Sequence, residues 1–204
     1  MKLSGLEIKE RRRKGEIVID PWDEAQLNPN SYNLRLGRML LVYAEDSGPP
    51  DTPGGLLDMA ANNLTHEHQI PDEGMILVPG RIYLGHTLEY TETHELIPCL
   101  EGRSSIGRLG INVHNTAGFG DVGFCGCWTL EISVVQPVRV YPFVQFCQIC
   151  YEPILGNYRP YESQKAYANQ QGPRPSGIWK ELREAREGRR KPKNGFGKRH
   201  GLRP

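Results

Sequence analysis

Short apolar runs separated by glycine- and proline-rich turns recur along the middle of this chain, and they constrain its fold more than any other feature. Residues 75–78 meet Pro79 and Gly80, and the chain returns as residues 82–90, which predicts a hairpin. Further runs of strand length follow at residues 94–100, 111–113, 125–135, 138–141 and 144–151. Many short strands with turns about every ten residues predict a mainly β fold, a barrel or a sandwich.

Other segments add little helix to this pattern. Ser4 followed by Glu7 fits a capping box, which predicts a short N-terminal helix to about Arg13 that Gly15 ends. Residues 31–37 alternate between apolar and polar side chains and predict another strand.

A chain of 204 residues fits one domain with C-terminal appendages. We place a β core at residues 1–156, interrupted by an irregular, Gly-, Pro-, Asp- and Asn-rich excursion at residues 45–73. A polar C-terminal segment follows at residues 157–187, with a short charged helix near its end. Residues 188–204, dense in Gly, Lys, Arg and Pro, predict a disordered basic tail.

The net charge of +1 conceals an asymmetry, because residues 180–204 hold ten Lys or Arg and three Asp or Glu. Nucleic-acid binding is an alternative to a solvated tail. Base stacking needs aromatic side chains among the basic ones, and Phe196 is the one aromatic side chain there, so we expect no nucleic-acid partner. No apolar run approaches the roughly 18 residues of a membrane span. The N-terminus also lacks the apolar centre of a secretory signal, so we expect a cytoplasmic protein without a membrane partner.

The five cysteines are Cys99, Cys125, Cys127, Cys147 and Cys150. An odd number in a reducing compartment predicts free thiols. Two close pairs raise the alternative of a zinc site, but both pairs lie in strand-like runs, where alternation separates Cys147 from Cys150 onto opposite faces. We therefore expect core thiols and no protein-held metal.

Residues 101–131 carry the chemistry of the chain. Their first part contains two arginines, two serines and a glycine that can leave neighbouring main-chain amides free to donate. These cations and donors suit a triphosphate, which carries roughly four negative charges and many acceptor oxygens. The residues of this first part are Arg103, Ser104, Ser105, Ile106, Gly107 and Arg108. The segment predicts a polyanion cradle without the P-loop sequence, and a turn with solvated arginines is the alternative.

The end of the same stretch holds one carboxylate. If residues 125–135 form one strand, Glu131 shares a face with Thr129 and the thiols of Cys125 and Cys127, while Leu130 points the other way. An apolar wall would desolvate the carboxylate and raise its pKa toward the value that a proton-shuttling glutamate needs. A solvent-facing glutamate is the ordinary alternative.

A glycine-containing linker joins these two parts. Gly118 and Gly120 allow unusual dihedral angles, so the Ala117 carbonyl can point at a ligand or a water. Asp121 can accept a sugar hydroxyl or help to position hydrated Mg²⁺, and a turn-forming aspartate is its alternative. Together the parts predict chemistry on a nucleoside triphosphate.

The block GRSSIGRLGINVHNTAGFGDVGF followed by TLE resembles the dCTP deaminase family, a branch of the trimeric deoxyuridine triphosphatase (dUTPase) superfamily. The resemblance extends from residue 31 to residue 172. It implies a distorted β-barrel of the β-clip, dUTPase-like type with a flexible C-terminal lid. It also implies a homotrimer with three active sites at subunit interfaces.

The resemblance further implies roles for single residues. Glu131 would deprotonate a water held partly by the Ala117 carbonyl and pass the proton to the base, without a protein-bound metal. The sequence pattern of the zinc deaminases is absent. The implied nucleotide-binding residues are Arg103, Ser104, Ser105, Ile106, Gly107, Arg108, Asp121, Thr129, Leu130, Glu131, Tyr161 and Gln170. Ser104 and Arg108 also match catalytic-site positions, and Tyr161 and Gln170 match the lid.

The leading hypothesis is a hydrolase that deaminates Mg²⁺-bound dCTP to dUTP and ammonia. The alternative is a bifunctional enzyme that also hydrolyses the diphosphate and releases dUMP, with Asp121 orienting the second water. Gly118 and Phe119 favour this alternative, because some deaminase-only relatives have His-Arg there. A non-catalytic nucleotide-binding regulator is the hypothesis from another class.

Overall fold

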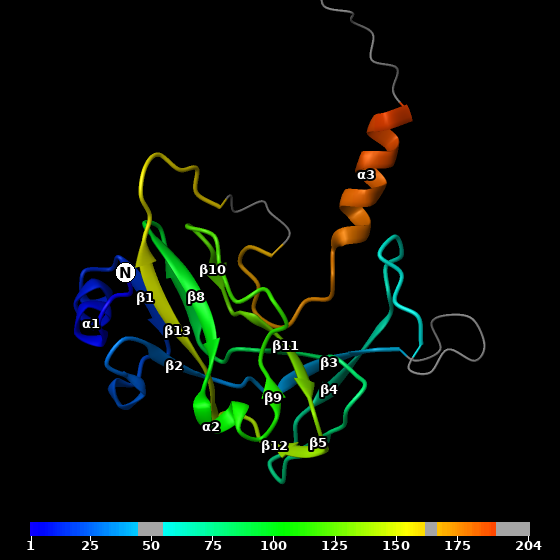
Figure 1. Ribbon diagram of the computed structural model, residues 1–204, viewed down its shortest axis with the longest axis horizontal. Helices are drawn as coiled ribbons and strands as arrows, with labels where there is room; N and C mark the ends of the chain where they lie inside the picture. The colour runs from blue at the N-terminus through cyan, green and yellow to red at the C-terminus, as the bar shows by residue number, and fades with distance from the viewer. Residues whose placement is uncertain (45–54, 162–166, 191–204) are drawn as a thin grey trace, which may run out of the picture.

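The computed structural model describes residues 1–44, 55–161 and 167–190 (Figure 1), and these residues confirm the mainly β class. The helical elements are α1 (Gly5–Arg13), η1 (Glu24–Gln26), α2 (Ser104–Gly107) and α3 (Ile178–Arg190). The first strands are β1 (Ile17–Asp20), β2 (Tyr32–Arg35), β3 (Met39–Tyr43), β4 (Thr65–Gln69), β5 (Met75–Leu77), β6 (Tyr83–His86) and β7 (Tyr90–Thr93). The later strands are β8 (Leu96–Gly102), β9 (Ile111–Asn112), β10 (Cys125–Gly126), β11 (Thr129–Val134), β12 (Val138–Val140) and β13 (Gln145–Pro153).

Hydrogen bonding divides the described strands among four open sheets. Their orders are β1-β7-β10, β4-β3-β6-β11-β9, β12-β5 and β2-β13-β8. The barrel is therefore distorted to the point that no closed ring of strands forms among the described residues. The pairings between these strands are antiparallel, so each strand can bury one face and solvate the other.

The sheets share one apolar core. The alternation predicted for residues 31–37 is confirmed, because Tyr32, Leu34 and Leu36 are all fully buried. Strand β13 adds Phe146 and Tyr151 to the same cluster. Each fully buried side chain of this size contributes about 1.5–3 kcal/mol of transfer free energy, so the core holds the separate sheets together.

The predicted N-terminal helix is confirmed as α1. The Ser4 hydroxyl accepts a hydrogen bond from the Glu7 amide at 3.2 Å, and Gly15 ends the helix in the left-handed region at φ 78°. The turn after β8 is also helical, as α2. The predicted charged C-terminal helix is α3, which stands away from the strands in Figure 1.

The predicted hairpin at residues 75–90 is wrong. Strand β5 pairs with β12, and the returning segment is divided between β6 and β7, which lie in different sheets. The division falls at Thr87–Glu89, where the Glu89 carboxylate is buried against Arg35. Residues 75–77, 83–86 and 90–93 do form strands, but which strands they pair with depends on the contact between Glu89 and Arg35, which is distant in sequence.

The excursion at residues 45–73 is more regular than the sequence predicts. It contains β4, whose side chains at residues 66–69 are exposed, so no apolar alternation marks the strand. Its partner β3 was also not predicted. Residues 45–54 of the excursion lie outside the described part of the chain.

The proposed boundaries after residues 156 and 187 stay predictions, and the basic residues 191–204 lie outside the described part. All five cysteines are free thiols, as expected, with Cys99 and Cys125 half-buried and the others buried. Over the described residues, the helices are too short or too polar to cross a bilayer.

Candidate active site

A cavity of about 560 Å³ opens between the five-stranded sheet and the C-terminal segment of residues 167–176. Four parts of the chain supply its walls: residues in or beside strands β3, β6, β10 and β11, the segment before β4, the loop after β9, and the C-terminal segment. The lining residues are Tyr43, Leu57, Ile82, Leu84, Asn115, Thr116, Ala117, Phe124, Trp128, Thr129, Glu131, Tyr167, Gln170, Arg174, Pro175 and Ser176. The cavity has the size and mixed lining of a small-molecule site.

Glu131 lies in the wall of this cavity. Along β11, burial alternates so that Thr129 and Glu131 are half-buried, whereas Leu130 is fully buried in the core. The Asn115 amide donates a hydrogen bond to the Glu131 carboxylate at 3.1 Å. This contact ties the carboxylate to the loop that also brings Ala117 to the cavity.

The predicted continuous strand at residues 125–135 is wrong. The segment breaks after Gly126, so β10 pairs with β7 and β11 pairs with β6. Gly126 has φ 141°, which side chains rarely adopt. The Trp128 amide, which follows the break, donates to the Thr87 hydroxyl at 2.9 Å. The segment therefore crosses from one sheet to another at the floor of the cavity.

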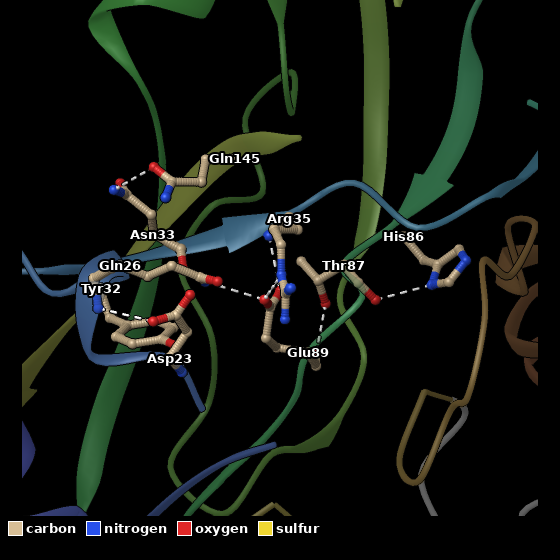
Figure 2. A network of polar contacts seen from close by, with 10 residues as sticks. Asp23, Gln26, Tyr32, Asn33, Arg35, His86, Thr87, Glu89 and Gln145 are labelled. Carbon is tan, nitrogen blue, oxygen red and sulfur yellow. Dashed lines mark hydrogen bonds and ion pairs between the residues drawn. The ribbon is translucent and has the colours of Figure 1, made fainter. Parts of the chain in front are cut away.

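A buried polar network supports this floor (Figure 2). The Glu89 carboxylate is 0 % exposed and accepts from the Arg35 guanidinium at 2.6 Å, from the Arg35 amide at 2.7 Å and from Gln26 at 3.1 Å. The Thr87 hydroxyl donates to the Glu89 carbonyl at 2.9 Å and accepts from Trp128. The network thus connects a paired buried charge to a residue that lines the cavity.

Cys127 lies within this floor as a neutral thiol. Burial, followed by the nearby charge of Glu89, raises the pKa of the Cys127 thiol to about 11. A thiol with such a pKa stays protonated near neutral pH, so it packs as an apolar group rather than acting as a nucleophile.

The C-terminal segment is held to the floor by main-chain contacts. Gln170 forms a parallel bridge with Gly126, and its carbonyl accepts from the Cys127 amide at 2.9 Å. Gln170 is 3 % exposed, and its side-chain amide donates to the Cys127 carbonyl. The hydroxyl of Thr129 accepts from the Arg174 amide at 3.1 Å.

Two tyrosine hydroxyls fix the end of this segment. Tyr43 accepts from the Ser176 amide at 3.1 Å, and Tyr167 accepts from the Gly177 amide at 3.0 Å. Residues 167–176, which include Gln170 of the predicted lid, are therefore held along one wall of the cavity.

The predicted polyanion cradle lies elsewhere on the chain. Arg103 precedes α2 and donates to the Gln145 carbonyl at 2.7 Å, while Ser104, Ser105, Gly107 and Arg108 are exposed and Ile106 is half-buried. None of these residues lines the cavity that contains Glu131. One copy of the described chain does not bring the two predicted halves of the site together.

Asp121 and Tyr161 lie at a second cavity of about 160 Å³. The Tyr161 amide donates to the Val122 carbonyl at 2.6 Å, which fixes the tyrosine beside the loop that contains Asp121. Burial raises the pKa of Tyr161. Tyr167 lines the larger cavity with Gln170, whereas Tyr161 does not.

Several lining residues were not predicted from the sequence. Tyr43 ends strand β3, and no local pattern in the sequence marks this tyrosine as a site residue. Trp128 and Phe124 pack beside the cavity with ring centroids 4.6 Å apart and ring planes tilted by 44°, although an apolar pattern there predicts only core packing. Over the described ranges, no group of three or more His, Cys, Asp or Glu side chains is placed to hold a metal ion.

Comparisons with known proteins agree with the sequence resemblance. Residues 2–154 match the family described as dCTP deaminase-like. A protein of Cytophaga hutchinsonii named "dCTP deaminase, dUMP-forming" is 54% identical over 182 residues, which cover 89% of this chain and 99% of the relative. Proteins of the same name from Hathewaya histolytica and Leptospira biflexa are 52% and 54% identical over 89% of this chain, and the matches cover 99% and 98% of those relatives.

A solved structure supports the fold. The 2'-deoxycytidine 5'-triphosphate deaminase from Agrobacterium tumefaciens superposes with a TM-score of 0.54 at 24% identity. The superposition covers 74% of this chain and 47% of that chain, so this chain spans about half the length of the solved one.

Proposed function

The chain belongs to the dCTP deaminase-like family, and from this premise we propose that it deaminates dCTP and carries the reaction on to dUMP and pyrophosphate. Relatives at 52–54% identity are named as dUMP-forming, which favours the bifunctional alternative over release of dUTP as the final product. The presence of Gly118 and Phe119, where some deaminase-only relatives have His-Arg, points the same way.

The observation that carries the proposal is the half-buried Glu131 in the wall of the 560 Å³ cavity. In the proposed first step, the carboxylate takes a proton from a water that the Ala117 carbonyl helps to hold. The resulting hydroxide attacks C4 of cytosine, and Glu131 delivers the proton to N3. Glu131 then takes the proton of the new C4 hydroxyl group and passes it to the exocyclic amine. Collapse of the tetrahedral intermediate releases ammonia and leaves the uracil base.

We propose that the phosphates are bound by the arginine and serine segment of a neighbouring copy. Arg108, Ser104 and Ser105 are exposed on α2 and so are available to a second subunit. Guanidinium groups bind phosphate oxygens in a bidentate manner, which suits a triphosphate. The expected homotrimer would place each such segment over the cavity of the next subunit.

In the proposed second step, Asp121 orients the water that attacks the phosphate chain. Mg²⁺ would enter with the nucleotide, since this ion is commonly held by substrate phosphates and several waters. It would neutralise charge that develops on the leaving pyrophosphate. A cytoplasmic location and the lack of a nucleic-acid partner stay predictions.

Product analysis tests the proposal. The purified protein is incubated with dCTP and Mg²⁺, ammonia is measured enzymatically, and nucleotides are separated by ion-exchange chromatography. We expect one ammonia and one pyrophosphate for each dUMP. Accumulation of dUTP alone would refute the second step, and absence of ammonia would refute the deaminase itself and favour a nucleotide-binding regulator.

A substitution tests the role of the carboxylate. Glu131→Gln keeps the size of the side chain but removes its basicity, so turnover should fall by about 10²–10⁴-fold while dCTP binding remains measurable by calorimetry. Glu67→Gln is the matched control, because Glu67 is an exposed glutamate on strand β4. Equal ammonia release by Glu131→Gln and the wild type would contradict the assignment.

A further inference from the structure

Two cysteines lie directly opposite each other on adjacent strands. In the antiparallel register of β13 and β8, Cys150 is the partner of Cys99. The Leu100 amide donates to Gly118 and the Pro98 carbonyl accepts from Gly120, so both neighbours of Cys99 direct these main-chain groups away from β13. Main-chain groups of successive residues in a strand point to opposite sides, so the amide and carbonyl of Cys99 point toward β13. Cys99 and Cys150 therefore form a hydrogen-bonded pair of the antiparallel ladder.

The spacing of the two α carbons is compatible with a bond between the sulfurs. Residues in a hydrogen-bonded antiparallel pair have Cα atoms about 5.5 Å apart, and disulfides most often span about 5.5–6 Å. The β carbons of a hydrogen-bonded pair lie about 5.5 Å apart and must approach to about 3.5–4.5 Å, so the closed bond is strained. Residues directly opposite each other also project from the same face of the sheet. The Cys150 sulfur already lies 3.6 Å from the Cys99 carbonyl oxygen.

The other three cysteines lack such a partner. Cys125 is opposite Glu92 in its strand pair, and Cys147 is opposite Leu34 and Gly102. Cys127 lies at the break between β10 and β11. Cys99 and Cys150 are therefore the two cysteines of this chain that strand pairing places opposite each other.

A lysine ammonium lies against one of the two sulfurs. Lys2 donates to the Cys150 sulfur at 3.0 Å and pairs with the Glu152 carboxylate at 3.0 Å. The Leu3 amide donates to the Tyr151 carbonyl at 2.9 Å, which holds the N-terminus in this place. The hydrogen bond to Cys150, followed by that to Glu152, raises the pKa of Lys2, so the cation persists at neutral pH. Reactive cysteines characteristically have a cation beside the sulfur.

We propose that Cys99 and Cys150 form a peroxide-sensitive pair that closes to a reversible cross-strand disulfide. The Cys150 sulfur attacks one oxygen of hydrogen peroxide, the O–O bond breaks, and the sulfur becomes a sulfenic acid while the thiol proton leaves with the displaced oxygen as water. The Cys99 sulfur then attacks the sulfenic sulfur, the S–O bond breaks, and the thiol proton leaves with that oxygen as water. In total, two thiols are oxidised to one disulfide and one peroxide is reduced to two waters.

The order of the two steps follows from the surroundings of each sulfur. Burial, followed by the neighbouring Cys150, raises the pKa of the Cys99 thiol, so Cys99 acts second. Cys99 is half-buried and gives a thiol reductant access to the bond, whereas Cys150 is 3 % exposed. A disulfide between adjacent strands must fit a fixed strand spacing, and constrained, accessible disulfides are the ones most easily reduced.

Non-reducing peptide mapping tests the proposal on the full-length protein in its native assembly. The protein is reduced, freed of reductant, treated with hydrogen peroxide and digested with all remaining thiols blocked. We expect each chain to lose two hydrogens, one linked peptide pair to contain residues 99 and 150, and dithiothreitol to reverse the link. Peroxide that leaves only sulfenic, sulfinic or sulfonic acid at these residues, or links other cysteines or separate chains, would overturn the proposal.

Variants distinguish the pair from general oxidation. Cys99→Ser and Cys150→Ser should each abolish the link, whereas Cys125→Ser, which alters another half-buried thiol, should keep it. Lys2→Gln should slow closure roughly threefold or more by removing the cation. Unchanged linking in either variant of the pair would also overturn the proposal, because the bond would then involve other residues.

Discussion

Mixing two inactive variants tests whether one site is built from two copies of the chain. One variant is Glu131→Gln, which damages the cavity wall, and the other is Arg108→Ala, which damages the exposed α2 segment. Alone, the first should retain about 10⁻² of the wild-type rate or less. The second loses charge-assisted hydrogen bonds of about 1.5–3 kcal/mol each, so about a tenth of the rate or less should remain.

The expected recovery follows from the separation of these two residues on one chain. In a cyclic trimer, each site would use Glu131 of one subunit and Arg108 of the next. Any trimer that contains both variants then has one site with both residues intact, whichever variant is present twice. Mixed trimers should therefore show about one third of the wild-type rate.

The assay uses co-expression of the two variants with different affinity tags. Purification on both tags in turn selects mixed assemblies, and ammonia release from dCTP gives the rate per trimer. A mixture of Ser104→Ala with Arg108→Ala is the control, because both changes damage the same segment and no intact site can arise. Mixed assemblies of Glu131→Gln and Arg108→Ala that stay as inactive as their parents would refute the shared site.

Three further expectations concern stability and the lid. Glu89→Gln should lower the free energy of unfolding in urea by about 3 kcal/mol, because it breaks a buried ion pair, whereas the exposed control Glu95→Gln should change it by less than about 0.5 kcal/mol. Burial lowers the pKa of His86 below its ordinary 6.5, so as the pH falls the unfolded chain binds the proton before the folded chain does. The stabilisation should therefore be complete above about pH 6.5 and be lost below it, and Tm should fall less steeply with pH in His86→Gln. Equal slopes of Tm against pH in the variant and the wild type would contradict this. Tyr43→Phe removes one hydrogen bond to the lid, worth about 0.5–1.5 kcal/mol, so the KM for dCTP should rise about 2–10-fold, and an unchanged KM would show that this hydroxyl does not hold the lid.

Much of the fold was predictable because local chemistry determines it. The Ser4 cap, the glycine that ends α1 and the alternation in β2 act within a few residues, so their signals are present in the sequence. Strand existence was also predictable in most of the β core. Strand pairing was not, because the division of residues 82–90 depends on a buried charge that is paired across 54 positions of sequence.

The candidate site was predictable in its chemical groups rather than in its assembly. Glu131, Thr129 and Ala117, which come from the block at residues 101–131, line one cavity, and their roles in a reaction stay predictions. The break at Gly126 was missed, since the residues around it look like one apolar strand. Tyr43 was missed because its role depends on a main-chain amide that is remote in sequence.

The amide of Cys127 has consequences for how the protein is made. Its partner, the Gln170 carbonyl, leaves the ribosome long after β10 and β11. A nascent chain can pair those strands with the earlier β7 and β6, yet the Cys127 amide at the floor of the cavity lacks this partner until residue 170 has been synthesised. This wall of the cavity is thus completed only after the strands have been made, and a product truncated before residue 170 would retain the partners of β10 and β11 but not this contact.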